Sequence, residues 1–242
     1  MPSFDFEEQR IVKEIQRLNA KRVVLQMPQG LKPEATKLAK IVEDTGAIAI
    51  ISSDPCYGAC DLALDTLNFA QVLVHFGHSP IEIHPQVIFE PYRIDFDIAV
   101  LENALPFLKG QSVALVTTVQ HVHLIPAMEK FLQAKRIDVI VAGGSGRTPN
   151  RGQVLGCNFA AAKVTGADEI LFVGTGLFHP VGIAIATNSR IIAIDPCTGD
   201  AREVNGDTLL RRRFALIEKA RGAKTVGIIV STKHGQQRME LA

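Results

Sequence analysis

The stretch Cys60-Asp-Leu-Ala-Leu-Asp-Thr-Leu-Asn-Phe-Ala-Gln-Val-Leu-Val-His-Phe-Gly77 decides the fold, because a second stretch repeats it without a gap. That second stretch is Cys157-Asn-Phe-Ala-Ala-Ala-Lys-Val-Thr-Gly-Ala-Asp-Glu-Ile-Leu-Phe-Val-Gly174. Each copy predicts a Cys at a helix start, a helix, an Ala-polar turn, a buried strand and a Gly. The alternative is two generic βα units, but the aligned cysteines favour an internal repeat.

Helical and apolar patterns continue the alternation outward from these copies. The predicted strands cover residues 22–26, 47–51, 71–75, 87–89, 112–116, 139–142, 170–173 and 190–194, and the predicted helices cover 6–18, 33–43, 62–69 and 123–134. A third start is predicted as a strand at 224–230. Continuous apolar strands between helices indicate parallel sheets covered on both faces. The sequence therefore predicts an α/β fold of repeated parallel-sheet domains, at 1–108 with Cys60, 109–222 with Cys157, and 223–242 as an incomplete third repeat.

Composition excludes few classes of protein but sets expectations. The 242 residues carry a formal net charge of +1, with 47% hydrophobic residues, no Trp and two Tyr. This balance predicts neither a nucleic-acid partner nor a membrane surface, and aromatic stacking platforms are scarce. The polar N-terminus does not resemble a signal peptide, and no apolar run reaches the roughly 18 residues of a membrane helix. We therefore expect a cytoplasmic protein whose four cysteines are reduced, metal-bound or catalytic.

The repeat sorts the cysteines. Cys60 and Cys157 occupy equivalent positions, whereas Cys56 has no counterpart and Cys197 aligns with Tyr92. A helix N-terminus would favour the thiolate form, and loops at the carboxyl ends of parallel strands converge on one crevice. Soft thiolates select zinc or an iron–sulfur cluster. Two small buried apolar residues are the alternative interpretation of this pair.

Cys56 and Cys60 also form the C-x-x-x-C start of the usual radical S-adenosylmethionine motif. Its third Cys would fall at Ala63, so a barrel enzyme of that kind is disfavoured.

Six segments together resemble the archaeal diphthamide-biosynthesis enzyme family, which starts the modification of elongation factor 2. They are Leu25-Gln-Met-Pro-Gln-Gly-Leu31, Asp54-Pro-Cys-Tyr-Gly-Ala-Cys-Asp61, Val74-His-Phe-Gly-His-Ser-Pro80, Gly156-Cys-Asn158, Phe172-Val-Gly-Thr-Gly-Leu-Phe-His-Pro180 and Val230-Ser-Thr-Lys-His-Gly-Gln236. The octapeptide ending at Asp61 is the most specific, and the resemblance spans nearly the whole chain.

The resemblance implies three α/β domains in a pseudo-three-fold arrangement around a 4Fe-4S cluster, with one Cys from each domain. Carried over, the first two ligands are Cys60 and Cys157, and one iron stays open for S-adenosylmethionine. The family implies a homodimer that cleaves the Cγ–S bond of S-adenosylmethionine. The 3-amino-3-carboxypropyl radical then attacks one histidine of elongation factor 2 and leaves methylthioadenosine. By the repeat spacing, the third Cys falls roughly 40 residues beyond its opening strand, past residue 242.

Several loop residues are further candidates for contacts with the cofactor. They follow predicted strands, where this fold places ligands, although ordinary turn chemistry explains them equally well. These candidates are Gln29, Gly30, His78, Ser79, Thr175, Gly176 and His179. Tyr57 is a candidate for stacking on the adenine, and the resemblance suggests that Lys233 reaches an anionic carboxylate. The run Arg211-Arg-Arg213 is interpreted as a solvated helix face.

Two other functions stay open from the sequence. One is a cluster enzyme of the quinolinate-synthase type, in which the cluster acts as a Lewis acid without S-adenosylmethionine. The other is a non-catalytic cluster-binding partner, which the missing third Cys favours. Anaerobic reconstitution with iron counting separates the non-catalytic partner from the two enzymes, and formation of methylthioadenosine separates the transferase from the quinolinate-synthase type.

Overall fold

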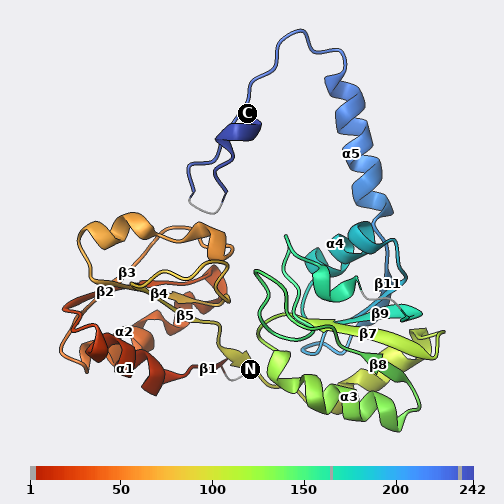
Figure 1. Ribbon diagram of the computed structural model, residues 1–242, viewed down its shortest axis with the longest axis horizontal. Helices are drawn as coiled ribbons and strands as arrows, with labels where there is room; N and C mark the ends of the chain where they lie inside the picture. Colours follow the sequence, from red (N-terminus) through yellow and green to blue (C-terminus); the bar gives the residue numbers. More distant parts are fainter. Residues whose placement is uncertain (1–3, 164–165, 234–235) are drawn as a thin grey trace. The chain divides into compact units, whose positions relative to one another are not determined.

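The computed structural model describes residues 4–163, 166–233 and 236–242. Contacts divide it into two compact units, which are best followed one at a time in Figure 1. The first unit comprises Phe4–Arg93 together with Ile228–Ala242, and the second comprises Ile94–Gly227.

The first unit is built on a parallel four-stranded sheet of order β3-β2-β4-β5. Its strands are β2 (Arg22–Gln26), β3 (Ile48–Ile51), β4 (Val72–Phe76) and β5 (Val87–Glu90). Helices α1 (Glu8–Arg17) and α2 (Ala35–Glu43) cover one face, and α2 follows the 3-10 helix η1 (Gln29–Glu34). The short 3-10 helices η2 (Ala59–Asp61) and η3 (Leu64–Asn68) belong to the chain on the other face. Strands β1 (Phe4–Asp5) and β6 (Arg93–Ile94) form a separate small sheet.

The second unit has a five-stranded sheet of order β11-β10-β9-β7-β8, in which only β11 is antiparallel to its neighbour. Its strands are β7 (Ser112–Thr117), β8 (Asp138–Ile140), β9 (Glu169–Val173), β10 (Ile191–Ile194) and β11 (Ala201–Val204). Helix α3 (Ile125–Ala134), preceded by η5 (Val122–Leu124), and the 3-10 helix η4 (Ile98–Phe107) cover one face. Helix α4 (Phe178–Thr187) and η6 (Ala160–Ala162) cover the other. Helix α5 (Asp207–Ala220) and η7 (Met239–Leu241) complete the regular structure.

The two sheets repeat one another in strand order and in register. Strand β2 lies between β3 and β4, as β7 lies between β8 and β9. Val23 pairs with Val72, and their counterparts Val113 and Glu169 pair in the same way. The ungapped alignment of the two Cys stretches also makes β4 and β9 begin and end together. The repeated α/β fold predicted from the sequence is confirmed, and the two repeats form separate sheets.

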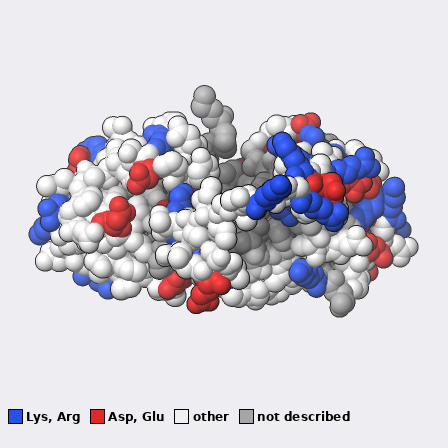
Figure 2. Space-filling model, turned by 90° about the horizontal axis from the view of Figure 1, so that it is seen from above, with Lys and Arg blue, Asp and Glu red and all other residues white. Residues whose placement is uncertain are grey.

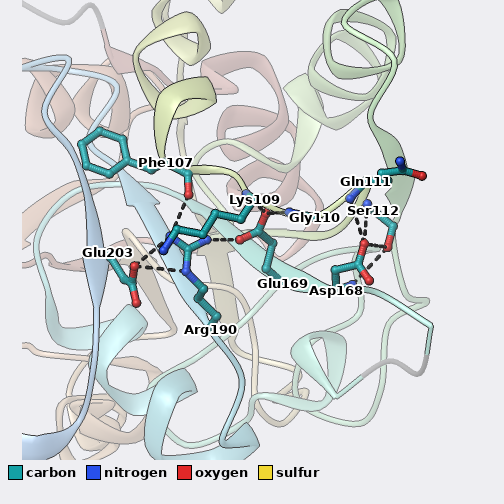
Figure 3. A network of polar contacts seen from close by, with 9 residues as sticks. All are labelled: Phe107, Lys109, Gly110, Gln111, Ser112, Asp168, Glu169, Arg190 and Glu203. Carbon is teal, nitrogen blue, oxygen red and sulfur yellow. Dashed lines mark hydrogen bonds and ion pairs between the residues drawn. The ribbon is translucent and has the colours of Figure 1, made fainter.

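The polar residue of the Ala-polar turn holds the same backbone in both repeats. In the first, Gln71 Oε1 accepts hydrogen bonds from the amides of Lys21 and Arg22, at 3.1 and 2.8 Å. In the second, Asp168 Oδ2 accepts from the amides of Gln111 and Ser112, both at 2.9 Å, as Figure 3 shows. The residue fixes the start of the strand next to its own, which explains why both repeats keep a polar residue there.

The segment predicted as a helix at 62–69 does not form a continuous α-helix and is helical only in part. The chain instead forms η2 and η3, because the amide of Ala63 donates to the side-chain Oε1 of Gln26 rather than to a helical carbonyl. The Cys157 stretch likewise turns through a bridge between Leu155 and Asn158 before the three-residue η6; Val164 and Thr165 of this stretch lie outside the described residues. Neither Cys60 nor Cys157 therefore begins an α-helix, so the macrodipole argument does not apply to them.

The strand predicted at 224–230 is also wrong. This segment has no regular structure, and Ile229 is 98% exposed. A strand needs a neighbouring strand to satisfy its backbone hydrogen-bonding groups, and no described strand lies paired with residues 224–230. The described residues from Ile228 onward belong to the first unit.

The compact units do not coincide with the predicted repeats. The second unit begins at Ile94 rather than near 109, because η4 packs against α3, β10 and β11. The division into repeats at 1–108, 109–222 and 223–242 stays a prediction about sequence repetition.

The Arg211–Arg213 run lies on a solvated face, as predicted from the sequence. None of the residues of α5 is buried, and blue side chains gather in Figure 2 where this helix lies. Among the described residues, no helix is both long and apolar enough to cross a bilayer.

His121 is expected to make the stability of the second unit pH-dependent. Its side chain is buried, and its Nδ1 donates to the carbonyl of Ile94 at 3.0 Å. Burial lowers the pKa of His121 below the usual value of about 6.5, with His123 lowering it further and Asp95 and Asp195 opposing this. His121 therefore binds a proton near pH 6.5 in the unfolded chain, whereas in the folded chain it becomes protonated only at lower pH. Stability is full above about pH 6.5 and falls at lower pH, by up to about 1.4 kcal/mol per pH unit for this one group.

Urea unfolding of the wild type and of His121→Gln at pH 7.5, 6.0 and 5.0 measures this effect. The Gln amide keeps a donor for the Ile94 carbonyl but cannot take up the proton, so the variant should lose less stability on acidification. Parallel pH profiles for the two proteins would exclude His121 as the cause.

Candidate functional site

Cys60 lies in η2, at the end of the first sheet where β2 and β4 finish. Gln26, the last residue of β2, donates from Nε2 to the carbonyl oxygen of Asp61 at 2.7 Å and thereby fixes the Cys60 turn. The Cys60 thiol is free and partly buried. Gln236 donates from Nε2 to Cys60 Sγ at 3.2 Å. The Cys60 sulfur therefore already faces a hydrogen-bond donor.

Asp61 joins the Cys60 turn to the C-terminal segment of the chain. Only 1% of its side chain is exposed. Its Oδ2 accepts from the amide of Tyr57 at 2.7 Å, and its Oδ1 accepts from Lys233 Nζ at 2.8 Å and from Gln236 Nε2 at 3.0 Å. The hydrogen bond to Asp61 raises the pKa of the Lys233 ammonium above its ordinary value. The carboxylate that Lys233 reaches in this structure is thus the chain's own.

Asp61→Asn should loosen the C-terminal segment. The amide keeps an acceptor for Tyr57 but loses the charge that holds Lys233, and charge-assisted hydrogen bonds are the stronger ones. Hydrogen–deuterium exchange of residues 236–242 should become several-fold faster than in the wild type. The control is Asp65→Asn, since Asp65 is exposed and lies in the same unit. Equal exchange in the two variants would show that Asp61 does not hold this segment.

The Cys157 turn of the second unit is exposed and packs beside the start of α4. The two backbone hydrogen bonds between Leu155 and Asn158 close the turn, at 2.9 and 3.1 Å. A Cβ atom on Gly156 would lie 2.3 Å from a ring carbon of the exposed Phe178, so this turn lies close against the start of α4. Cys157 is consequently a free, exposed thiol on a turn that is fixed by its neighbours.

The loop candidates of the first unit divide between the Cys60 turn and other places. Tyr57 is 83% exposed and lies beside Lys233, whose Nζ is 5.8 Å from the centre of its ring. His78 is half-buried, and its ring hydrogen bonds to the backbone of Tyr57. Ser79 is buried, whereas Gln29 and Gly30 are exposed at the start of η1. Tyr57 and His78 are therefore the candidates that lie near Cys60.

In the second unit, the candidates follow β9. Thr175 and Gly176 are exposed in the loop before α4, and Gly176 has a φ of +72° that favours glycine. The His179 ring stacks on Phe172, with centroids 5.9 Å apart, and burial lowers the pKa of His179. His179 is thus partly a packing residue. Because Cys60 and Cys157 belong to different units, the distance between their sulfurs stays a prediction.

Four further residues surround Cys60 that the sequence had not marked as site candidates: Gln26, Asp61, His75 and Gln236. Gln26 and His75 are polar residues at or near the ends of strands whose other central residues are apolar and buried. That interruption was the available signal. Nothing in the sequence pattern indicated that Gln236 would reach Cys60; the two adjoining motif residues, His234 and Gly235, lie outside the described residues.

Comparisons with known proteins agree with the geometry. The family model for diphthamide synthesis proteins matches residues 27–242. A 2-(3-amino-3-carboxypropyl)histidine synthase of Pyrococcus horikoshii is 38% identical over an alignment that covers 97% of this chain and 70% of the relative. Subunit 1 of the corresponding synthase of Encephalitozoon cuniculi is 30% identical, over 95% of this chain and 68% of the relative.

Solved structures match equally well. The crystal structure of Dph2 from Pyrococcus horikoshii superposes with a TM-score of 0.90 at 36% identity, covering 99% of this chain and 72% of that one. A second structure of the same protein, which contains a 4Fe-4S cluster, gives a TM-score of 0.91. The family resemblance seen in the six motifs is confirmed, and this chain belongs to the diphthamide synthesis protein family.

Proposed function

We propose that this protein is a 2-(3-amino-3-carboxypropyl)histidine synthase that binds a 4Fe-4S cluster through Cys60 and Cys157. It transfers the 3-amino-3-carboxypropyl group of S-adenosylmethionine to a histidine of elongation factor 2. The observation that carries the proposal is the repeat itself, in which two equivalent turns each present a free cysteine. A relative of the same fold was solved with such a cluster.

The residues present fit a cluster. Cys60 and Cys157 are both free and both accessible, in contrast to the buried Cys56. Gln236 already donates to Cys60 Sγ, and donors of this kind stabilise cluster-bound thiolates and tune their potential. When bound, the cluster supplies the electron and the open iron for cleavage of the Cγ–S bond of S-adenosylmethionine.

The chain's own residues hold and orient the reacting groups. The Cys60 and Cys157 thiolates are the ligands from the two repeats. Asp61, through Lys233 and Gln236, keeps the C-terminal segment against the Cys60 turn. Tyr57 and His78 lie near Cys60 and are proposed to contact S-adenosylmethionine from the first unit. The remaining candidates for that contact are Gln29, Gly30, Ser79, Thr175, Gly176 and His179.

The proposal extends to the setting of the reaction. The protein substrate is elongation factor 2, the working form is a homodimer, and the site of action is the cytoplasm. The family match favours this reaction over chemistry of the quinolinate-synthase type, because the matched relatives are named as histidine synthases. A non-catalytic cluster-binding role is the second candidate, and the product assay separates it from the transferase.

The product assay tests the proposal. The reconstituted protein is incubated anaerobically with a reductant, S-adenosylmethionine and archaeal elongation factor 2. Methylthioadenosine and a 3-amino-3-carboxypropyl group on one histidine of elongation factor 2 are the expected products. Cluster formation without methylthioadenosine would favour the non-catalytic role, and no cluster at all would contradict the proposal.

A further inference from the structure

Three side chains that can coordinate a metal lie close together inside the first unit, and Cys60 is not one of them. They are Cys56, His75 and His78, and one ligand atom of each lies within 4.8 Å of the others. Cys56 and His75 are buried and His78 is half-buried. His75 comes from β4, His78 follows that strand, and Cys56 comes from the loop before η2. The proposed cluster function uses neither Cys56 nor His75.

The hydrogen bonds around Gln26 fix the protonation of His75. Gln26 Nε2 donates to the carbonyl of Asp61 at 2.7 Å, and its Oε1 accepts from the amide of Ala63 at 3.2 Å, so the orientation of the amide is determined. The Oε1 atom also lies 2.9 Å from His75 Nδ1, which must therefore carry the hydrogen. His75 Nε2 is left with a lone pair, and it points at His78 Nδ1 at 3.0 Å.

This is the arrangement that metal-binding histidines use. A ligating imidazole donates its other N–H to a fixed oxygen, which sets the tautomer and the direction of the lone pair. Here Gln26 has that role, and its own orientation is fixed by two backbone groups. On the third side chain, burial raises the pKa of the Cys56 thiol, and the nearby backbone of Gly58 opposes this rise only in part.

We propose that Cys56, His75 and His78 form a mononuclear site for a divalent cation of the zinc class, separate from the proposed cluster ligands. Two imidazole nitrogens and one thiolate suit a borderline-soft cation such as Zn²⁺ or Co²⁺ better than Mg²⁺ or Ca²⁺. Three protein ligands leave a fourth position for water or a small ligand. The buried carboxylate of Asp61 acts electrostatically on all three side chains and compensates part of the cation's charge. The site does not depend on the proposed transferase activity.

Binding of a cation at this site should displace a proton from the protein. Burial raises the pKa of the Cys56 thiol to about 11 and lowers the pKa of His75 to about 3, so the thiol is protonated and the imidazole is neutral at pH 7. Cation binding should therefore release about one proton per site, from Cys56.

Titration with Co²⁺ tests the site in the whole chain. The background protein carries Cys60→Ser, Cys157→Ser and Cys197→Ser, which leaves Cys56 as the one thiol among the four cysteines of the sequence. One equivalent of Co²⁺ should bind and give a thiolate-to-cobalt charge-transfer band in the near ultraviolet. X-ray absorption of the Zn²⁺ form should show one sulfur at about 2.3 Å and two nitrogens at about 2.0–2.1 Å.

Two variants and a matched control in this background assign the ligands. Loss of a hydrogen-bonding partner of a ligand lowers metal affinity about 10–100-fold, so loss of a ligand should lower it by more than about 100-fold. We expect this loss of affinity in both Cys56→Ser and His78→Asn. Cys56→Ser should also lose the charge-transfer band. The control is His84→Asn, because His84 lies in the same unit but is not one of the three proposed ligands. The affinity of this variant for Co²⁺ should not change.

Three results would overturn the proposal. The first is a charge-transfer band that persists in Cys56→Ser, and the second is equal affinity in His78→Asn and His84→Asn. The third is an X-ray absorption spectrum of the background protein that shows nitrogen and oxygen ligands alone. Because Cys56, His75 and His78 are unchanged in that protein, this result does not depend on whether their variants fold.

Discussion

Cys60→Ala and Cys157→Ala are each expected to abolish stable binding of the 4Fe-4S cluster. Each of the two proposed ligands holds one iron of the cluster, and loss of either thiolate leaves that iron exposed and makes the cluster labile. Anaerobic reconstitution, followed by iron and sulfide determination and by the visible thiolate-to-iron absorbance, measures the loss.

Two other cysteine variants are the controls. Cys197→Ala should leave the spectrum nearly unchanged, because Cys197 is exposed and its counterpart in the repeat is Tyr92, which is no ligand. Cys56→Ala should retain most of the cluster absorbance, since Cys56 is buried next to His75 and His78 rather than presented on the surface. A loss in Cys56→Ala comparable to that in Cys60→Ala would contradict the assignment.

Arg190→Met should destabilise the second unit by about 3 kcal/mol. Arg190 hydrogen bonds to Glu169 on β9, to Glu203 on β11 at 2.7 Å and to the carbonyl of Phe107 at 2.7 Å, as Figure 3 shows. The Glu169 side chain is only 2% exposed, so removing Arg190 leaves a buried carboxylate without a charged partner. Such losses cost about 3–5 kcal/mol. The lower end applies because 22% of the Arg190 side chain is exposed and two backbone amides still bind Glu169.

Denaturant unfolding measures this change. The matched control is Arg202→Met on the neighbouring strand, because Arg202 has a single ion pair of 4.0 Å to Asp200 at the surface and should change stability by less than about 0.5 kcal/mol. In Arg190→Met, the further change Glu169→Gln should restore part of the stability by removing the buried charge. Equal stability of Arg190→Met and Arg202→Met would show that the network does not support the sheet.

The strands of both sheets could be predicted from the sequence because each strand is a short apolar run and because the order of the runs is repeated. Buried apolar runs marked β2, β4, β7, β9 and β10 to within a residue or so of their observed bounds. The ungapped match between the two Cys stretches then related one sheet to the other. The same match selected Cys60 and Cys157 as candidate ligands without any knowledge of the surrounding contacts, and their role stays a prediction.

The parts that the sequence did not reveal depend on contacts between distant residues. Ala63 leaves the expected helix because its amide binds Gln26, which lies 37 positions earlier in the chain. Lys233 and Gln236 meet Asp61 across 172 and 175 positions. The apolar run at 224–230 reads as a strand, but a strand exists only where a neighbour pairs with it. No periodicity within a short window contains that information.

A crystal structure of the anaerobically reconstituted protein tests the central claim most directly. We predict that the Sγ atoms of Cys60 and Cys157 each bind one iron of the same cluster and lie about 6–7 Å apart, since ligands of separate irons in one cubane have that spacing. Cys56 should lie outside the coordination of the cluster. A cluster bound by Cys56 in place of Cys60, or one that leaves Cys157 without an iron, would contradict the account.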